Sequence, residues 1–142
     1  MKITLDTNVL ISALIINGKS RTLLFEIMRR KHELILSKEI LEEFTEVSRD
    51  PKIRRYVNEE DATGYLRCLA NLARIVQIKS KFSIVKEDPD DDVILRTAHD
   101  GNAKYLVTGD KHLVKLKRFR KTRIVTVDEM LRILRSKLTE RS

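Results

Sequence analysis

Four aspartates occupy positions 88 to 92 of a chain that is otherwise strongly basic: Asp88, Asp90, Asp91 and Asp92. Such a cluster suits the start of a helix, because acidic side chains in the first turn interact favourably with the helix dipole. It also suits one wall of a metal site. Asp88 precedes Pro89, which is typical of an N-cap followed by proline at the first helical position. Capping and the first turn account for Asp88 and Asp90 but do not require Asp91 and Asp92.

Helical phase separates the two remaining aspartates. Asp91 lies three residues before Ile94 and four before Leu95, so it continues the apolar stripe of the helix to its first turn. A carboxylate on the buried side needs a partner, because an unpaired buried charge is costly. Asp92 aligns with Leu95 but also with Arg96, and we expect it to turn further outward. Asp91 is therefore the preferred inward-pointing acid, with Asp92 as the alternative.

Three acids elsewhere belong with this cluster. Asp6 ends the run ITLD and Asp110 ends YLVTGD, so both follow strand-like segments. Glu43 flanks the apolar stripe of the helical pattern KEILEEFTEV, for which Ser37 is the expected N-cap. Ordinary surface exposure is the alternative for a helical glutamate, so Glu43 is a candidate only together with Asp6 and Asp110.

A divalent metal site is the chemistry that these acids indicate. Two carboxylates 4 Å apart repel by ~4 kcal/mol at an effective dielectric constant near 20, so protonation or a cation must relieve them. Oxygen ligands suit Mg²⁺ or Mn²⁺, whereas no cluster of cysteine and histidine indicates zinc. We predict Asp6, Asp91, Asp92 and Asp110 as metal ligands, and Asp6, Glu43, Asp91 and Asp110 as catalytic residues. A metal held there could activate water for phosphodiester hydrolysis.

A basic run follows Asp110 directly. Seven of the thirteen residues from 111 to 123 are lysine or arginine, and the net charge of the chain is +8. A polyanion lying across an acidic cleft needs flanking cations to hold its backbone, although a solvated helix end and loop is the alternative. The predicted substrate-binding residues are Lys111, Lys115, Lys117, Arg118 and Arg120.

Alternating strand and helix patterns must position these side chains. The strand candidates are residues 3–5, 33–36, 74–78, 104–108 and 123–127, and the helical patterns are residues 22–30, 38–47, 60–73, 90–100 and 127–138. This alternation predicts an α/β fold with five parallel strands covered by helices on both faces. Ligands in such sheets bind beyond the carboxyl ends of the strands, which is where Asp6 and Asp110 fall.

The length of 142 residues predicts one domain over residues 1–142, with the last few residues as a disordered tail. The single cysteine, Cys68, cannot form an internal disulfide and lies in an apolar stretch, where we expect it to be buried. A reducing, cytoplasmic location fits this expectation. No run approaches the ~18 apolar residues of a membrane span.

Four stretches together resemble the PIN-domain nucleases and, within them, the VapC-like toxins of prokaryotic toxin-antitoxin systems. They are ITLDTNVLISAL, SKEILEEF, DPDDDVILRTAHDGNAKYLVTGDKHLVKL and RIVTVDEML, in the family order from residue 3 to residue 131. The resemblance implies a three-layer α/β/α sandwich and a ribonuclease that depends on Mg²⁺ or Mn²⁺. The family's acids fall on Asp6, Glu43, Asp91 (or Asp92) and Asp110, and Asn8 and Thr108 match the small polar positions beside the first and last of them.

The resemblance also implies partners: RNA as the substrate, an antitoxin protein, and a second copy of the chain in a homodimer or higher homo-oligomer. A non-catalytic PIN scaffold that binds RNA, or an RNA-processing factor, is the alternative. A phosphatase of the haloacid dehalogenase type would need a second aspartate two positions after Asp6, where this chain has Asn8.

Overall fold

The computed structural model describes residues 1–85 and 88–141, of which 137–141 are described by their backbone alone. The described strands form one sheet in the order β3-β2-β1-β4-β6-β5. They are β1 (Lys2–Leu5), β2 (Glu33–Ser37), β3 (Arg74–Val76), β4 (Tyr105–Val107), β5 (Arg118–Phe119) and β6 (Thr122–Val125). The helices are α1 (Thr7–Ile15), α2 (Lys19–Arg29), α3 (Lys38–Ser48), α4 (Pro51–Arg54), α5 (Glu59–Leu72), α6 (Pro89–Asp100), α7 (Lys111–Leu116) and α8 (Val127–Arg141).

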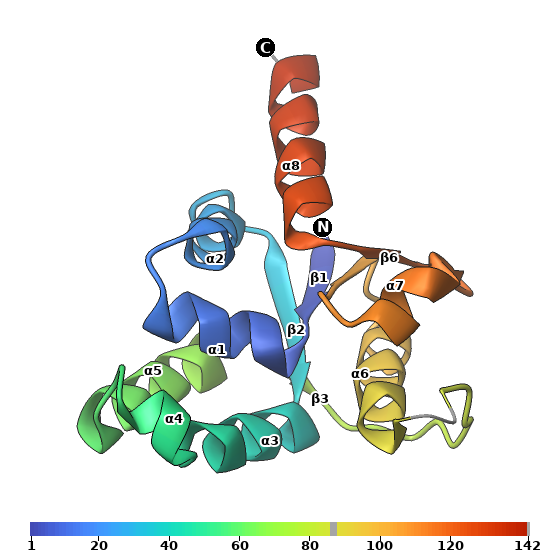
Figure 1. Ribbon diagram of the computed structural model, residues 1–142. Coiled ribbons are helices and arrows are strands. Elements are labelled where there is room, and N and C mark those ends of the chain that lie inside the picture. Colours follow the sequence, from blue (N-terminus) through green and yellow to red (C-terminus); the bar gives the residue numbers. More distant parts are fainter. Residues whose placement is uncertain (86–87, 142) are drawn as a thin grey trace.

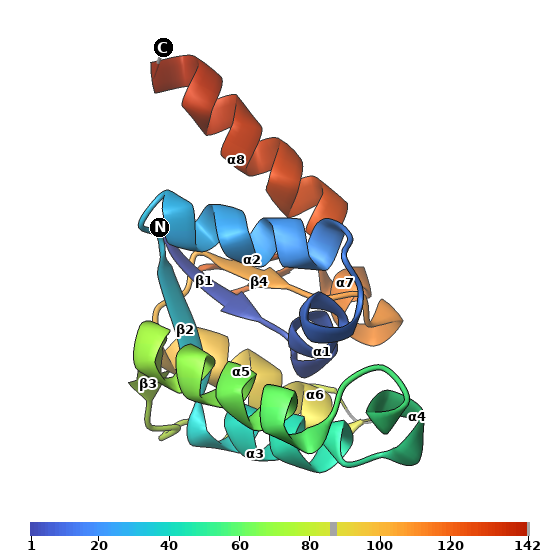
Figure 2. The same ribbon diagram turned by 90° about the vertical axis from the view of Figure 1, so that its left-hand side faces the viewer.

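Helices cover both faces of the sheet. Helices α1, α2 and α5 lie on one side and α6 and α7 on the other (Figure 1). Turning the molecule by 90° brings α5 in front of α6 (Figure 2). Helix α5 contacts β3, and α6 contacts β1, β2 and β4. The predicted three-layer α/β/α sandwich is therefore confirmed.

The sheet contains one strand more than the sequence predicted. The five expected strands are present and pair in parallel with one another. The sixth, β5, pairs antiparallel to β6 at the edge, with Arg118 opposite Arg123. A two-residue turn connects these strands, as is common in hairpins. The alternation typical of strands is hidden here because the segment is short and mostly charged.

Continuous burial of the strand residues explains why their sequences are nearly all apolar. In β2, the side chains from Leu34 to Ser37 are all buried, because helices cover both faces of a parallel sheet. The hydrophobic core includes Ile3, Leu36, Phe44 and Leu106, which come from separate elements.

Helix α1 was not predicted as a separate element. Its residues are buried almost all round, including Val9, Leu10 and Ile11. An apolar pattern without a polar face lacks the amphipathic period by which surface helices are recognised. Cys68 corrects a second expectation, since its side chain is exposed on α5 rather than buried.

Helix α8 packs its first turns against the body and then extends away from it (Figure 2). Leu131 and Leu134 are buried, and Arg30 Nη1 on α2's carboxyl end donates to the Leu134 carbonyl at 2.6 Å. Helix α8 ends at Arg141 and Ser142 lies outside the described residues, so the expected disordered tail stays a prediction. Across residues 1–85 and 88–141, none of the helices combines the length and apolar character needed to cross a bilayer.

Candidate metal centre

Asp6 and Asp110 follow the carboxyl ends of two neighbouring strands, β1 and β4. Each carboxylate also caps the helix that comes next. Asp6 Oδ1 accepts from the Asn8 N–H at 3.4 Å, and Asp110 Oδ1 accepts from the N–H groups of His112 at 2.8 Å and Leu113 at 3.3 Å. The strand-to-helix connections therefore bring both acids to one edge of the sheet, as their positions in the sequence predicted.

Thr108 joins these two acids. Its hydroxyl donates to Asp6 Oδ2 at 2.6 Å and accepts from the Asp110 N–H at 3.0 Å. The side chain is fully buried, so this geometry is held by the surrounding core. The side chain of Asn8 is exposed, and the structure connects this residue to Asp6 through its backbone N–H.

Helix α6 brings further carboxylates to the same edge. Oxygens of Asp88, Asp91 and Asp110 lie within 4.8 Å of one another. Asp88 is also the N-cap of α6, accepting from the Asp90 N–H at 3.0 Å. Capping was the only role predicted for Asp88 from the sequence. Its spacing of three residues from Asp91 indicates a second role beside that acid, because residues three apart share a helix face.

Asp91 is the acid most deeply placed in this group. Its side chain is only 5% exposed, and its Oδ2 has no hydrogen-bond partner among the described residues. Burial raises the pKa of this carboxyl to about 7, and the nearby charges of Asp110 and Asp88 add to the effect. A buried carboxylate oxygen without a donor is costly, so this set of oxygen atoms fits a hard divalent cation such as Mg²⁺ or Mn²⁺.

Glu43 reaches the site from α3. Thr7 Oγ1 donates to Glu43 Oε2 at 2.9 Å, which ties the glutamate to the residue next to Asp6. Burial raises the pKa of Glu43, with smaller contributions from the charges of Asp90, Asp6 and Asp88. Burial likewise raises the pKa of Asp6, against the opposing effect of its hydrogen bond from Thr108. Each of these carboxyls is therefore held in surroundings that disfavour its ionised form.

Asp92 points elsewhere. Its Oδ1 accepts from the N–H groups of Ile84 at 2.8 Å and Val85 at 3.0 Å, and its Oδ2 accepts from Ser83 Oγ at 3.3 Å. The side chain is 2% exposed, so the expected outward turn of Asp92 is wrong. Helical phase described its neighbours within α6 but not the preceding loop, which covers it. The structure does not bring Asp92 into the group formed by Asp88, Asp91 and Asp110.

The five predicted substrate-binding residues are spread from the acidic edge of the sheet to the opposite edge. All five are exposed: Lys111, Lys115, Lys117, Arg118 and Arg120. Lys111 begins α7 directly after Asp110, whereas Arg120 lies in the turn before β6. Since β4 and β6 are parallel, Arg120 is at the amino ends of the strands, opposite the acidic edge.

The raised pKa of Asp91 predicts a pH-dependent stability for the metal-free protein. Between the ordinary aspartate pKa near 4 and about 7, the folded state binds more protons than the unfolded state, so stability falls as pH rises through this window. We expect the free energy of unfolding in EDTA to fall by roughly 2 to 3 kcal/mol between pH 5 and pH 8. Urea denaturation at both pH values measures it.

Asp91→Asn should remove most of this pH dependence, because an amide does not titrate in the window. Asp128→Asn is the matched control. The hydrogen bond and charge of Lys19 lower the pKa of Asp128, so the stability that Asp128 contributes is lost only below pH ~4. A wild-type protein that is as stable at pH 8 as at pH 5 would contradict the proposed burial of Asp91.

Comparisons with known proteins agree with this architecture. A family model described as "PIN domain" matches residues 2–112. An uncharacterized protein of Methanocaldococcus jannaschii is 34% identical over 122 residues, covering 82% of this chain and 76% of the relative. The crystal structure of VapBC2 from Rickettsia felis, bound to a DNA fragment from its promoter, contains a chain with a TM-score of 0.62 and 20% identity; the match covers 89% of this chain and 98% of that one.

Proposed function

Because the chain belongs to the PIN-domain family, we propose that it is a divalent-metal-dependent endoribonuclease. The observation that carries this proposal is the group formed by Asp88, Asp91 and Asp110, in which a buried oxygen of Asp91 has no partner among the described residues. Such an arrangement is unfavourable for an RNA-binding surface alone, because carboxylates repel phosphates. It becomes favourable when a cation lies between the acids and the substrate.

In this proposal, Asp91, Asp110 and Asp88 hold Mg²⁺ or Mn²⁺, and Asp6 contributes from the adjoining strand. When bound, the divalent ion supplies positive charge to the phosphodiester and acidifies the attacking water. Thr108 fixes the orientation of the Asp6 carboxylate through the 2.6 Å hydrogen bond.

Glu43 is the residue proposed to accept the proton of the water. Thr7 occupies its Oε2, which leaves Oε1 to take the proton. A raised pKa suits a general base near neutral pH, and Glu43 has such a pKa because of its burial. Lys111 and Lys115, both exposed on α7, are proposed to bind phosphates of the RNA beside the acids.

We further propose that this nuclease is the toxin of a toxin-antitoxin pair that acts in the cytoplasm. The support is the fold that it shares with a chain of the VapBC2 complex, together with the sequence resemblance to VapC-like toxins. The same resemblance supports an antitoxin that blocks the acidic edge and a homodimer or higher homo-oligomer. We also propose that residues 1–142 form one PIN-like domain, since all described strands belong to one sheet.

A non-catalytic RNA-binding scaffold, or an RNA-processing factor, is the second candidate. The exposed basic run after Asp110 favours it, because cations suffice to bind RNA. This candidate predicts RNA binding that is equal in Mn²⁺ and in EDTA, with no cleavage in either.

Cleavage of mixed RNA by the purified protein separates these candidates. We expect cleavage in Mn²⁺ or Mg²⁺, loss of cleavage in EDTA, and a decrease of at least about 100-fold in Asp6→Asn, because the carboxylate next to the metal is lost. The fraction of intact RNA over time, on a denaturing gel, gives the rate. Cleavage that persists in EDTA, or in the Asp6→Asn variant, would contradict the proposed metal-dependent nuclease.

A further inference from the structure

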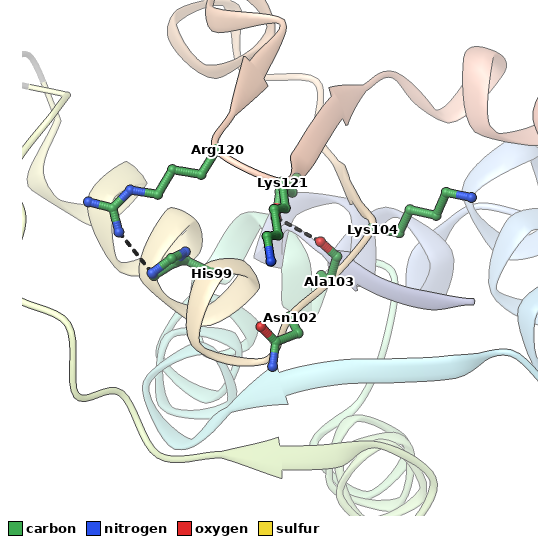
Figure 3. Close-up of a pocket in the computed structure, with 7 residues that line it drawn as sticks. His99, Asn102, Ala103, Lys104, Arg120 and Lys121 are labelled. Carbon is green, nitrogen blue, oxygen red and sulfur yellow. Dashed lines mark hydrogen bonds between the residues drawn. The ribbon is translucent and has the colours of Figure 1, made fainter.

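A cavity of about 390 Å³ lies at the opposite edge of the sheet from the acids. Its walls come from the carboxyl end of α6, the connection into β4 and the turn between β5 and β6. Figure 3 shows the side chains of His99, Arg120, Lys121 and Lys104 distributed around it. Nothing in the proposed cleavage reaction uses this cavity.

Three cationic residues contribute to the walls, of which Lys104 directs its ammonium away from Lys121 (Figure 3) and over the Tyr105 ring, 5.8 Å from its centre. Lys104, Arg120 and Lys121 line the cavity, and no acidic residue does so among the described lining residues. Within residues 1–85 and 88–141, none of these three cations forms an ion pair with a carboxylate. Concave surfaces lined by one sign of charge concentrate the electrostatic field and attract counter-charged ligands. The cavity is therefore suited to an anion.

Arg120 is held in place by three aromatic neighbours. Its Nη1 is hydrogen-bonded to His99 Nε2 at 2.9 Å, and its guanidinium carbon lies 5.3 Å from the ring centre of Phe82 and 5.0 Å from that of Phe119. These contacts leave guanidinium N–H groups for a ligand, since an arginine has five. A preorganised arginine loses less conformational entropy on binding than a free one.

Arg120 has a left-handed backbone conformation, which it shares with Lys31, Asn102 and Lys117 among the described residues. Its φ is 53°, in the left-handed region where glycine or asparagine is preferred in a two-residue hairpin turn. An arginine at such a position adopts a backbone conformation that bulky residues rarely take. In this conformation, the guanidinium of Arg120 stacks on Phe82 and Phe119 and is hydrogen-bonded to His99.

Size and charge together favour a nucleotide over a simple ion. A volume of about 390 Å³ falls within the range of small-molecule sites and is larger than inorganic phosphate requires. Lys121 lies between Arg120 and Lys104, which extend in different directions (Figure 3). Cations spread in this way suit several anionic oxygens rather than one compact group. The basic run also reaches this cavity from Asp110 along α7 and β5.

We propose that this cavity is a second phosphate-binding site, which takes the phosphates of a nucleotide. The nucleotide is either free or part of an RNA chain whose cleaved bond lies at the acidic edge. If it is part of an RNA chain, the inference rests on the proposed function. Asp91 and His99, at the two ends of α6, are eight residues apart, which is roughly 12 Å along the helix axis. Arg120 and Lys121 are the principal binding residues.

Binding to the full chain in EDTA tests this site without relying on cleavage. The probes are adenosine diphosphate, by calorimetry, and a fluorescent 12-nucleotide RNA, by anisotropy. The variants are Arg120→Gln and Lys121→Gln. Lys121 is an exposed turn residue, so its variant is expected to fold even if loss of the Arg120 stacking is disruptive. Lys52→Gln, which removes a charge from the exposed helix α4, is the matched control.

We expect Lys121→Gln and Arg120→Gln to weaken binding by at least about fivefold relative to Lys52→Gln. Loss of adenosine diphosphate binding identifies a free nucleotide as the source of the phosphates, and weaker binding of the 12-mer alone identifies RNA. Binding of both probes that matches the control overturns the inference. It is also overturned if hexaglutamate binds the wild type and loses affinity in the variants while both nucleotide probes are unaffected. Nucleotide binding without cleavage in Mn²⁺ would contradict the proposed nuclease alone.

Discussion

Asp91→Asn should lower the rate of metal-dependent RNA cleavage by more than about 100-fold. Loss of a residue that only supports a metal ligand typically costs 10- to 100-fold, and Asp91 is placed to contact the metal itself. Its Oδ2 is buried without a hydrogen-bond partner among the described residues, and its oxygens lie near those of Asp88 and Asp110. An amide keeps the size of the side chain but removes the charge that a divalent cation requires. Initial cleavage rates in Mn²⁺ measure the effect.

Asp90→Asn is the matched control for this prediction. Asp90 is the adjacent residue in α6 and is exposed, so the same change of charge should alter the rate by less than about threefold. The metal-free Asp91→Asn protein should also be at least as stable as the wild type at pH 8, because the buried charge is gone. Cleavage at the wild-type rate by a folded Asp91→Asn protein would exclude Asp91 as a metal ligand.

Much of the arrangement around this site could be predicted from the sequence, because parallel strands end at one edge of a sheet. Asp6 and Asp110 each follow a buried apolar run, and this alone placed them together once the alternation of strands and helices was recognised. Local patterns were sufficient because each of these residues is positioned by the strand that immediately precedes it. Thr108 was expected beside Asp110 from the family resemblance alone, and its hydrogen bonds to both acids were not predicted.

The remaining features depend on contacts between segments that the sequence does not link. Asp92 is buried because residues 83–85 fold back over it, and a helical wheel contains no information about that loop. Thr7 could not be connected with Glu43, since 36 residues separate them. The turn at Arg120 lies at the far edge of the sheet because β5 reverses direction, whereas proximity in sequence to Asp110 suggested a place beside the acids.

Asp92→Ala should lower the free energy of unfolding by about 3 kcal/mol. The substitution leaves the N–H groups of Ile84 and Val85 without their acceptor, and hydrogen bonds to a charged group contribute about 1.5 to 3 kcal/mol each. Asp92→Asn should cost less, because the amide oxygen still accepts one of these bonds. Urea denaturation in EDTA measures both variants, and a lower midpoint with an unchanged slope indicates lost stability.

This prediction also distinguishes the two adjacent aspartates. If Asp92 holds the loop of residues 83–85 in place, the decrease in cleavage by Asp92→Asn should follow the loss of folded protein, and added Mn²⁺ should stabilise this variant as it does the wild type. Binding to the folded state at a hundred times the dissociation constant adds about 2.7 kcal/mol, which is large enough to detect. A variant that is as stable as the wild type but neither binds Mn²⁺ nor cleaves RNA would place Asp92 at the metal, and the choice of Asp91 by helical phase would then be wrong.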